Sequence, residues 1–361
     1  MDDPAPATVM AGAGRLISRE SVMLIIDGSA GEGGGQILRT SLALSLATHT
    51  PVRITGIRKG RQRPGLMRQH LTAVRACAKI GNAEIVGDEV GSTQITFTPG
   101  EVTPGDYTFA IGTAGSTTLV LQAVLPALLC AKARSTIALV GGTDNPMAPT
   151  FEFLARAYLP LVRRMGPVVT PEIEARGFYP AGGGRFRVTV DPSPTLSRLD
   201  LLERGALLRK SVVATVANLP GAIARRELEA ANELLGWDPS CLRIEALKGA
   251  PGPGNVVSIV IESEHVTEVV SSFGEKGRAS EIVGAAAARE ALAYLESGVP
   301  VGEHLADQLL LPMALAGGGS FRTTAPSSHT ATHLRLLEQI LGVRSRVEAL
   351  ADGAWLIEVG R

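Results

Sequence analysis

GSAGEGGGQILRTSLALSLA occupies residues 28–47 and joins a glycine-rich turn to apolar residues at helical spacing. A second stretch, GTAGSTTLVLQAVLPALLCA (112–131), begins with the same Gly-Ser/Thr-Ala-Gly turn and continues into another apolar helix. AGGGRFRVT (181–189) and AGGGSFRTT (316–324) match almost letter for letter. These pairs predict a supersecondary unit used three times, twice before about residue 200 and once completed by the C-terminal segment.

Strand and helix patterns alternate around the first stretch. SVMLIIDGSA (21–30) and VRITGIRKG (52–60) are predicted strands. PGLMRQHLTAVRACAKIG (64–81) is a predicted helix, which Pro64 opens near its first turn. This alternation indicates an α/β fold.

Residues 204–297 interrupt the repeats, because they carry strands and helices that can close a small α/β layer of their own. We therefore expect an inserted small domain at 204–297 within a large domain formed by 22–203 plus 298–361. Residues 1–21 carry acidic residues where a signal peptide carries positive charge, so we interpret them as a loose extension or as the result of a start site placed too early.

The composition of the 361 residues allows a substantial core, with 45% apolar residues, 19% charged residues and a formal net charge of zero. Any nucleic-acid partner must therefore be held by a local basic patch. The three cysteines form no CxxC pair, which favours a cytoplasmic protein. Gln122 and Pro126 interrupt the most apolar run (117–131), so we expect a buried helix there and no association with a membrane.

The glycine run 28–36 lacks the Gly-Lys-Ser/Thr ending of a P-loop and is not GxGxxG. Glycines before a helix still offer backbone N–H groups to an anion. The Glu32 carboxylate would repel an anion bound at this turn unless a divalent cation lay between the two. This suggests that Glu32 is a ligand for Mg²⁺ or Mn²⁺. A surface turn with an incidental glutamate is the other interpretation.

The stretch 53–79 contains basic residues and no acidic residue. Its members are Arg53, Arg58, Lys59, Arg61, Arg63, Arg68, Arg75 and Lys79. We expect several of them to converge into a patch that grips phosphates, although a solvated face is the usual meaning of such a run.

SSHTATH (327–333) places His329 and His333 four residues apart, at the start of a predicted helix. The spacing suits two zinc ligands or two unrelated side chains, and no third His or Cys ligand lies nearby in sequence. No GxSxG elbow is present, so His329 is the nucleophile candidate by elimination. Residues 302–308 gather polar side chains at another helix start, which could join it in one site.

Seven blocks follow one another along the chain, namely 28–45, GIRKGRQRPGLMRQHLTA (56–73), AIGTAGSTTLVLQ (110–122), GGTDNPMAP (141–149), RGFYPAGGGRFRV (176–188), GEHLADQLLLPMALAGGGSF (302–321) and SSHTATH. In sequence and in order, these blocks resemble those of the RNA 3′-terminal phosphate cyclase family. The resemblance runs from about residue 22 to the C-terminus, and RGFYPAGGG is the family's signature.

The resemblance implies three βαβαββ units, as in the enolpyruvyl transferases, with a thioredoxin-like insert. It also implies that an RNA 3′-phosphate becomes a 2′,3′-cyclic phosphate, with ATP and a divalent metal, through an adenylylated His329. Glu32 matches the family's metal-associated glutamate. The phosphate-binding positions are Arg39, Arg58, Arg61 and Gln69, and the ATP-pocket positions are Gln122, Pro149, His304, Leu305, Ala306, Asp307 and Gln308.

One position departs from the family, since an aromatic Tyr is expected at residue 304 and this chain has His. Imidazole stacks more weakly on adenine, so nucleotide preference or affinity is in question. Two alternatives remain beside the cyclase. A non-catalytic RNA-binding relative of the kind that serves ribosome assembly lacks the nucleophilic histidine, which this chain retains, and an enolpyruvyl-type transferase needs no such histidine.

Overall fold

The first sheet is built around the glycine-rich turn and the helix that follows it. Its strands are β1 (Leu24–Asp27), β2 (Val52–Thr55), β4 (Ile95–Thr98) and β3 (Glu84–Val86), in that spatial order. Helix α1 (Gly35–Thr48) joins β1 to β2, and α2 (Arg68–Gly81) joins β2 to β3. The computed structural model describes residues 23–360, so the expected extension at 1–21 lies outside the described residues.

Two further sheets repeat this order of elements. The second contains β5 (Asp106–Ala110), β6 (Ser135–Gly141), β8 (Gly184–Asp191) and β7 (Val168–Ala175), and the third contains β9 (Leu199–Leu201), β14 (Gly319–Thr323), β16 (Trp355–Gly360) and β15 (Arg344–Ala349). Their helices are α3 (Thr117–Leu129), α4 (Phe151–Phe153), a π-helical turn (Leu154–Tyr158), α5 (Leu159–Arg164), α8 (Glu303–Leu315) and α9 (Ser328–Leu341).

In each of the three sheets, the first two strands pair in parallel and the last two strands pair antiparallel. The strand order is therefore the same in all three. The α/β class is confirmed. The likeness to the enolpyruvyl transferases and the domain boundaries stay predictions.

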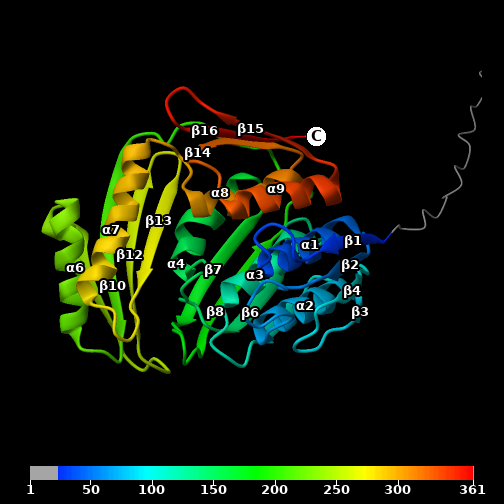
Figure 1. Cartoon of the computed structure of the whole chain (residues 1–361), viewed down its shortest axis with the longest axis horizontal. Coiled ribbons are helices and arrows are strands. Elements are labelled where there is room, and N and C mark those ends of the chain that lie inside the picture. The colour runs from blue at the N-terminus through cyan, green and yellow to red at the C-terminus, as the bar shows by residue number, and fades with distance from the viewer. Residues whose placement is uncertain (1–22, 361) are drawn as a thin grey trace, which may run out of the picture.

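A fourth sheet interrupts the third unit between β9 and α8 (Figure 1). It contains β11 (Leu242–Leu247), β10 (Leu207–Ala217), β12 (Gly254–Ser263) and β13 (Thr267–Phe273), with α6 (Gly221–Leu235), a 3₁₀ turn (Pro239–Cys241) and α7 (Ser280–Ser297). Its apolar side chains, among them Val212, Ile259 and Ala287, form a cluster separate from the main core. Strand β13 forms one edge of this sheet.

Helix α1 lies at the centre of the larger core, where it contacts α2, α3 and α9 (Figure 1). Its side chains are buried almost all round, which fits a helix packed between others rather than on a surface. Helix α3 is also buried, as expected for the apolar run with Pro126. Within residues 23–360, no helix is long and apolar enough to cross a membrane.

Two predictions about local structure are wrong. Pro64 does not open a helix: α2 begins at Arg68, because the Gly65 and Leu66 amides donate to the Ile57 and Ser92 carbonyls and hold this segment as a loop. The second pair of similar stretches does not mark equivalent positions. AGGGRFRVT leads into β8, the third strand of its sheet, whereas AGGGSFRTT leads into β14, the second strand of its sheet.

Candidate active site

Helix α9 carries both histidines on its first two turns. Ser327 caps the helix, and its hydroxyl accepts a hydrogen bond from the Thr330 amide at 3.3 Å. His329 is the second residue of α9 and its side chain is half exposed, whereas 2% of the His333 side chain is exposed. A helix N-terminus presents unpaired N–H groups and partial positive charge, so this turn favours an anion beside His329.

The two histidines do not form a pair of metal ligands. His333 Nδ1 lies 3.0 Å from the Asp307 carbonyl oxygen and 3.1 Å from Asp307 Oδ1. His333 Nε2 lies 3.4 Å from the Thr40 hydroxyl. Both nitrogens therefore face protein groups, and no cluster of three or more His, Cys, Asp or Glu in the described chain is arranged to hold a metal. The geometry gives the zinc interpretation no support.

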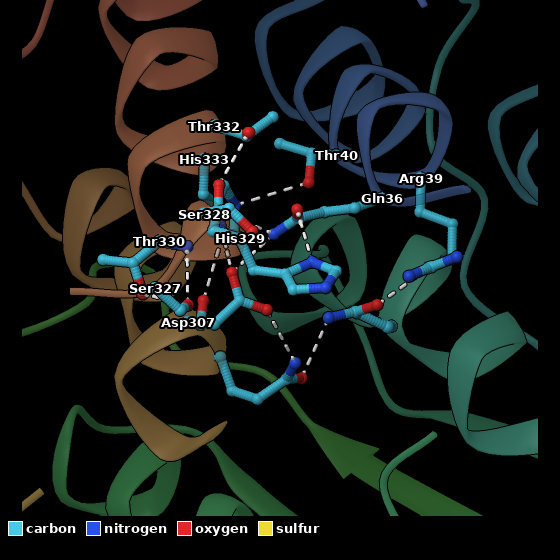
Figure 2. A network of polar contacts seen from close by, with 12 residues as sticks. Gln36, Arg39, Thr40, Asp307, Ser327, Ser328, His329, Thr330, Thr332 and His333 are labelled. Atoms are coloured by element: carbon cyan, nitrogen blue, oxygen red, sulfur yellow. Dashed lines mark hydrogen bonds and ion pairs between the residues drawn. The ribbon is translucent and has the colours of Figure 1, made fainter. Parts of the chain in front are cut away.

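Gln36 of α1 connects the two histidines through Asp307 of α8 (Figure 2). Its Nε2 donates to Asp307 Oδ1, and its Oε1 lies 3.1 Å from His329 Nδ1. Burial opposes ionisation of Asp307, but the hydrogen bond from His333 and neighbouring positive charges hold its pKa below the usual value. An ionised carboxylate therefore lies at the centre of this network.

A cavity of about 780 Å³ opens beside His329. Its volume is within the range of small-molecule sites. Nine of the expected site residues line it, namely Glu32, Arg39, Arg58, Arg61, Gln69, Pro149, His304, Gln308 and His329. The other four expected residues, Gln122, Leu305, Ala306 and Asp307, are not part of its lining.

The four remaining residues lie behind the cavity wall. Gln122 accepts a hydrogen bond from Arg39 Nε at 2.8 Å and donates to Gln308 Oε1 at 2.9 Å. Leu305 and Ala306 pack in the core. Gln122 therefore holds two residues of the lining in place, as Asp307 does for Gln36.

Arginines make one wall of the cavity cationic. Burial lowers the pKa of Arg39 to about 10, with the Asp307 charge opposing that shift, so Arg39 remains charged at neutral pH. Arg58 adopts a left-handed backbone conformation, with φ of 55°. Its Nη1 donates to the carbonyl oxygens of Arg63 and Gly65 at 2.7 and 3.0 Å. Two fixed guanidinium groups thus face the space beside His329.

The basic stretch 53–79 does not act as one patch. Arg58 and Arg61 are its two arginines on the cavity lining. Arg75 pairs with Asp88 at 2.9 Å, and Arg53 donates to the Thr96 hydroxyl at 3.3 Å. The convergence that we expected therefore involves part of the stretch, together with Arg39 from α1.

Glu32 forms an ion pair with Arg61, and its Oε1 lies 4.0 Å from His329 Nε2. The carboxylate is therefore beside the nucleophile candidate, as the cation interpretation requires, but its partner here is an arginine. The glycines that follow permit this crowding. A Cβ on Gly34 would clash with Glu32 Oε2 and would lie 3.0 Å from Arg61 Nη2.

The opposite wall comes from the fourth sheet. Val269, Ser271 and Phe273 of β13 line the cavity, and Arg278 follows them in the loop before α7. The Ser271 hydroxyl has no hydrogen-bond partner among the described residues. Arg278 Nη1 donates to the Phe273 carbonyl at 3.1 Å. The sequence interpretation assigned these residues no role, because nothing local links 269–278 to His329.

His304 lies on the cavity lining with 72% of its side chain exposed, and its Nε2 is 3.7 Å from Glu290 Oε1. Burial raises the pKa of Glu290, and His304 opposes that shift. Pro149 also lines the cavity. The His304 imidazole therefore has the Glu290 carboxylate of α7 as its neighbour.

Sequence reasoning also assigned no role to Gln36 and His70. Burial, together with the charges of Arg39 and Arg58, lowers the pKa of His70 to about 3, so its ring is neutral. His70 Nδ1 accepts a hydrogen bond from the Met67 amide at 3.3 Å, which leaves Nε2–H on the side of Gly35. A signal for Gln36 existed, since it is a polar residue at the start of an apolar helix.

Comparison with known proteins agrees with these blocks. A family model described as RNA 3′-terminal phosphate cyclase matches residues 30–347. An RNA 3′-terminal phosphate cyclase from Koribacter versatilis is 49% identical over 321 residues, covering 89% of this chain and 90% of the relative. The protein of that name from Ralstonia nicotianae is 51% identical over 331 residues, covering 91% and 94%. A third, from Salmonella typhimurium, is 46% identical over 337 residues, covering 93% and 98%.

Proposed function

The chain belongs to the RNA 3′-terminal phosphate cyclase family, and we propose that it uses ATP to convert an RNA 3′-phosphate into a 2′,3′-cyclic phosphate. The intermediates are an adenylyl-histidine on His329 and an RNA(3′)pp(5′)A, and the products include AMP and pyrophosphate. The observation that carries this proposal is the position of His329, half exposed at a helix N-terminus and beside a cavity lined by arginines.

The first step is attack of His329 on the α-phosphorus of ATP. A P–N bond forms, the P–O bond to the β-phosphate breaks, and pyrophosphate leaves. Imidazole is suited to this attack at neutral pH, because its unperturbed pKa lies near 6.5. Arg39 and Arg58 face the developing negative charge from fixed positions, so they need little reorganisation during the step.

The second and third steps transfer AMP and close the ring. An oxygen of the RNA 3′-phosphate attacks the same phosphorus, the P–N bond breaks, and His329 is regenerated. The neighbouring 2′-hydroxyl then attacks the 3′-phosphorus, loses its proton and expels AMP. The vicinal hydroxyl is already in place, so the enzyme mainly has to supply the leaving group and hold the RNA end.

Pro149 and His304 are the groups that we assign to the two sides of adenine, and Gln308 is a polar group beside them. Gln69 extends the phosphate site. Its Oε1 accepts a hydrogen bond from the Ser116 amide at 2.6 Å, which leaves its NH₂ group as a donor. Gln122 supports this arrangement from behind.

The donor chemistry fits a divalent cation held mainly by substrate phosphates. Glu32 supplies one carboxylate beside His329, and Mg²⁺ commonly binds through one or two carboxylates together with phosphates and water. When bound, Mg²⁺ or Mn²⁺ would neutralise phosphate charge. Glu32 would then exchange its ion pair with Arg61 for the cation, which would free Arg61 for a phosphate.

Labelling with ATP tests the proposal directly. The protein is incubated with ATP labelled at the α-phosphate and with Mg²⁺ or Mn²⁺, without RNA, and is then denatured and separated by electrophoresis. We expect label on the protein that is acid-labile and alkali-stable, is absent from His329→Ala, and is discharged by RNA ending in a 3′-phosphate. His265→Ala serves as the matched control, because His265 is exposed and lies outside the cavity lining.

Absence of label from the folded protein with either metal, while RNA still binds, would refute the cyclase mechanism. It would favour the non-catalytic RNA-binding alternative. Label on His333 rather than His329 would keep the adenylylation chemistry but contradict the assignment of the nucleophile.

A further inference from the structure

We propose that Gln36 is a positioning residue that fixes the tautomer of His329, with hydrogen on Nδ1 and the free electron pair on Nε2. This inference rests on the proposed function, because it names the nitrogen that attacks. It assigns a role to a side chain that the sequence interpretation passed over.

The orientation of the Gln36 amide follows from its neighbours. Its Nε2 faces two acceptors, the Asp307 carboxylate and the His329 carbonyl oxygen at 3.4 Å. Rotating the amide by half a turn would place its oxygen against both of these oxygens. The NH₂ group therefore faces Asp307, and the amide oxygen faces His329 Nδ1 at 3.1 Å.

An amide oxygen only accepts hydrogen bonds, so His329 Nδ1 must carry the hydrogen. In a neutral imidazole, the other nitrogen then has the free electron pair. That nitrogen, Nε2, lies 4.0 Å from Glu32 Oε1, and both side chains line the cavity. The ring therefore presents its nucleophilic atom where we place the α-phosphate of ATP.

His333 holds the far end of this chain of contacts. Its Nδ1 faces two Asp307 oxygens, at 3.0 and 3.1 Å, so this nitrogen also carries hydrogen and donates. That donation keeps Asp307 as a carboxylate, which can only accept from Gln36. The direction of every bond is thus set from His333 through Asp307 and Gln36 to His329 (Figure 2).

The hydrogen bond from His329 Nδ1–H to the Gln36 oxygen serves both the formation and the breakage of the P–N bond. When Nε2 forms the P–N bond, the ring gains positive charge, and the Gln36 oxygen already accepts from Nδ1–H. When the P–N bond breaks, the ring leaves as neutral imidazole in the same tautomer. No proton has to move at Nδ1 in either step.

Nuclear magnetic resonance of the full chain with ¹⁵N-labelled histidine tests this without ATP. The chain has six histidines, and the His329 signals are identified by their loss in His329→Ala. At a pH where the ring is neutral, we expect a protonated Nδ1 and an unprotonated Nε2. A protonated Nε2 in the wild-type protein would overturn the proposal.

Gln36→Met keeps the side-chain length but removes donor and acceptor. We expect His329 to become a mixture of tautomers and the rate of adenylylation to fall roughly ten- to a hundredfold, as when an orienting partner is lost. Gln339→Met is the control. Gln339 is exposed on α9, the helix that carries His329, and donates to the Ile25 carbonyl. The control should keep both the tautomer and the rate.

Asp307→Leu is a second variant, which removes the side-chain acceptor that orients the amide while keeping Gln36. It should give the same mixture of tautomers, and an unchanged tautomer in both variants would overturn the proposal. The positioning role of Gln36 and the cyclase activity can be refuted independently of each other. Adenylylation at the wild-type rate in Gln36→Met would refute the positioning role and leave the cyclase intact, whereas an ordered tautomer in a protein that never takes label would refute the cyclase alone.

Discussion

The two walls of the cavity differ in how firmly their polar groups are held. On the wall formed by α1 and α9, Gln36 and Arg39 each have a partner from another element. On the β13 wall, the Ser271 hydroxyl has no partner among the described residues, and Arg278 is bonded to a nearby backbone carbonyl. The first wall is therefore organised before substrate arrives, which suits chemistry. The second wall carries an exposed arginine with further N–H donors besides that bond, which suits recognition of a substrate, whereas the Ser271 hydroxyl is buried.

The largest effect is expected on the organised wall. Arg39→Ala should slow adenylylation roughly a hundredfold, because a fixed donor to the phosphates is lost. It also removes a positive charge near Asp307. Single-turnover labelling measures the rate, and Arg53→Ala is the control, because Arg53 is exposed on β2 and bonded to Thr96. Equal rates in the two variants would contradict the role of Arg39 in adenylylation.

Arg278→Ala probes the opposite wall and should act on RNA rather than on ATP. We expect the KM for RNA to rise about three- to tenfold, which is the loss of one exposed phosphate contact worth roughly 1 kcal/mol. The rate of adenylylation without RNA should not change. The slope of the logarithm of RNA affinity against the logarithm of salt concentration should become shallower by the amount that one phosphate contact contributes. A change in adenylylation alone would show that this wall serves ATP.

His304→Tyr restores the aromatic residue expected at this position and should tighten ATP binding about threefold, since a larger ring stacks better on adenine. It also removes the neighbour of Glu290. Titration with ATP and with GTP measures affinity and preference. His265→Tyr is the control, because His265 lies outside the cavity lining. Weaker ATP binding in His304→Tyr would contradict adenine stacking at this position.

Glu268 connects β13 to the start of α8 and should give the smallest effect. Its carboxylate, on β13, accepts hydrogen bonds from the Gly302 amide before α8 and from the Val269 amide. Burial raises its pKa from 4.5 to about 7, although these hydrogen bonds oppose the shift. The folded state therefore binds this proton more tightly than the unfolded state. The stabilisation is complete below about pH 4.5 and is lost as the pH rises through about 7.

Glu268→Gln should flatten this pH dependence of the free energy of unfolding. Chemical denaturation across the same pH window measures it. Glu233→Gln, at an exposed position on α6, should behave as the wild-type protein does. Identical slopes in Glu268→Gln and wild type would show that this carboxyl does not titrate between the folded and unfolded states.

Local patterns predicted the elements well where a single segment decides them. The stretch 28–47 and its counterpart 112–131 form α1 and α3 at equivalent places in their sheets. The likeness of 181–189 to 316–324 was misleading, because glycines before a strand serve any tight turn and do not fix the place of that strand in a sheet. Pro64 misled for a related reason: long-range backbone hydrogen bonds override its local preference.

Of the candidate site, the sequence alone determined that a histidine with no partner motif, a glutamate after a glycine turn and several arginines were present. Only the tertiary structure decided which of them meet. Gln36 and His329 are 293 positions apart, and the β13 wall belongs to a different sheet. Hydrophobic periodicity records which face of an element is buried, since burial acts on each element separately. A hydrogen bond between two elements leaves no such periodicity in the sequence of either element. The direction of the hydrogen bonds from His333 to His329 can therefore be seen only in the packed structure.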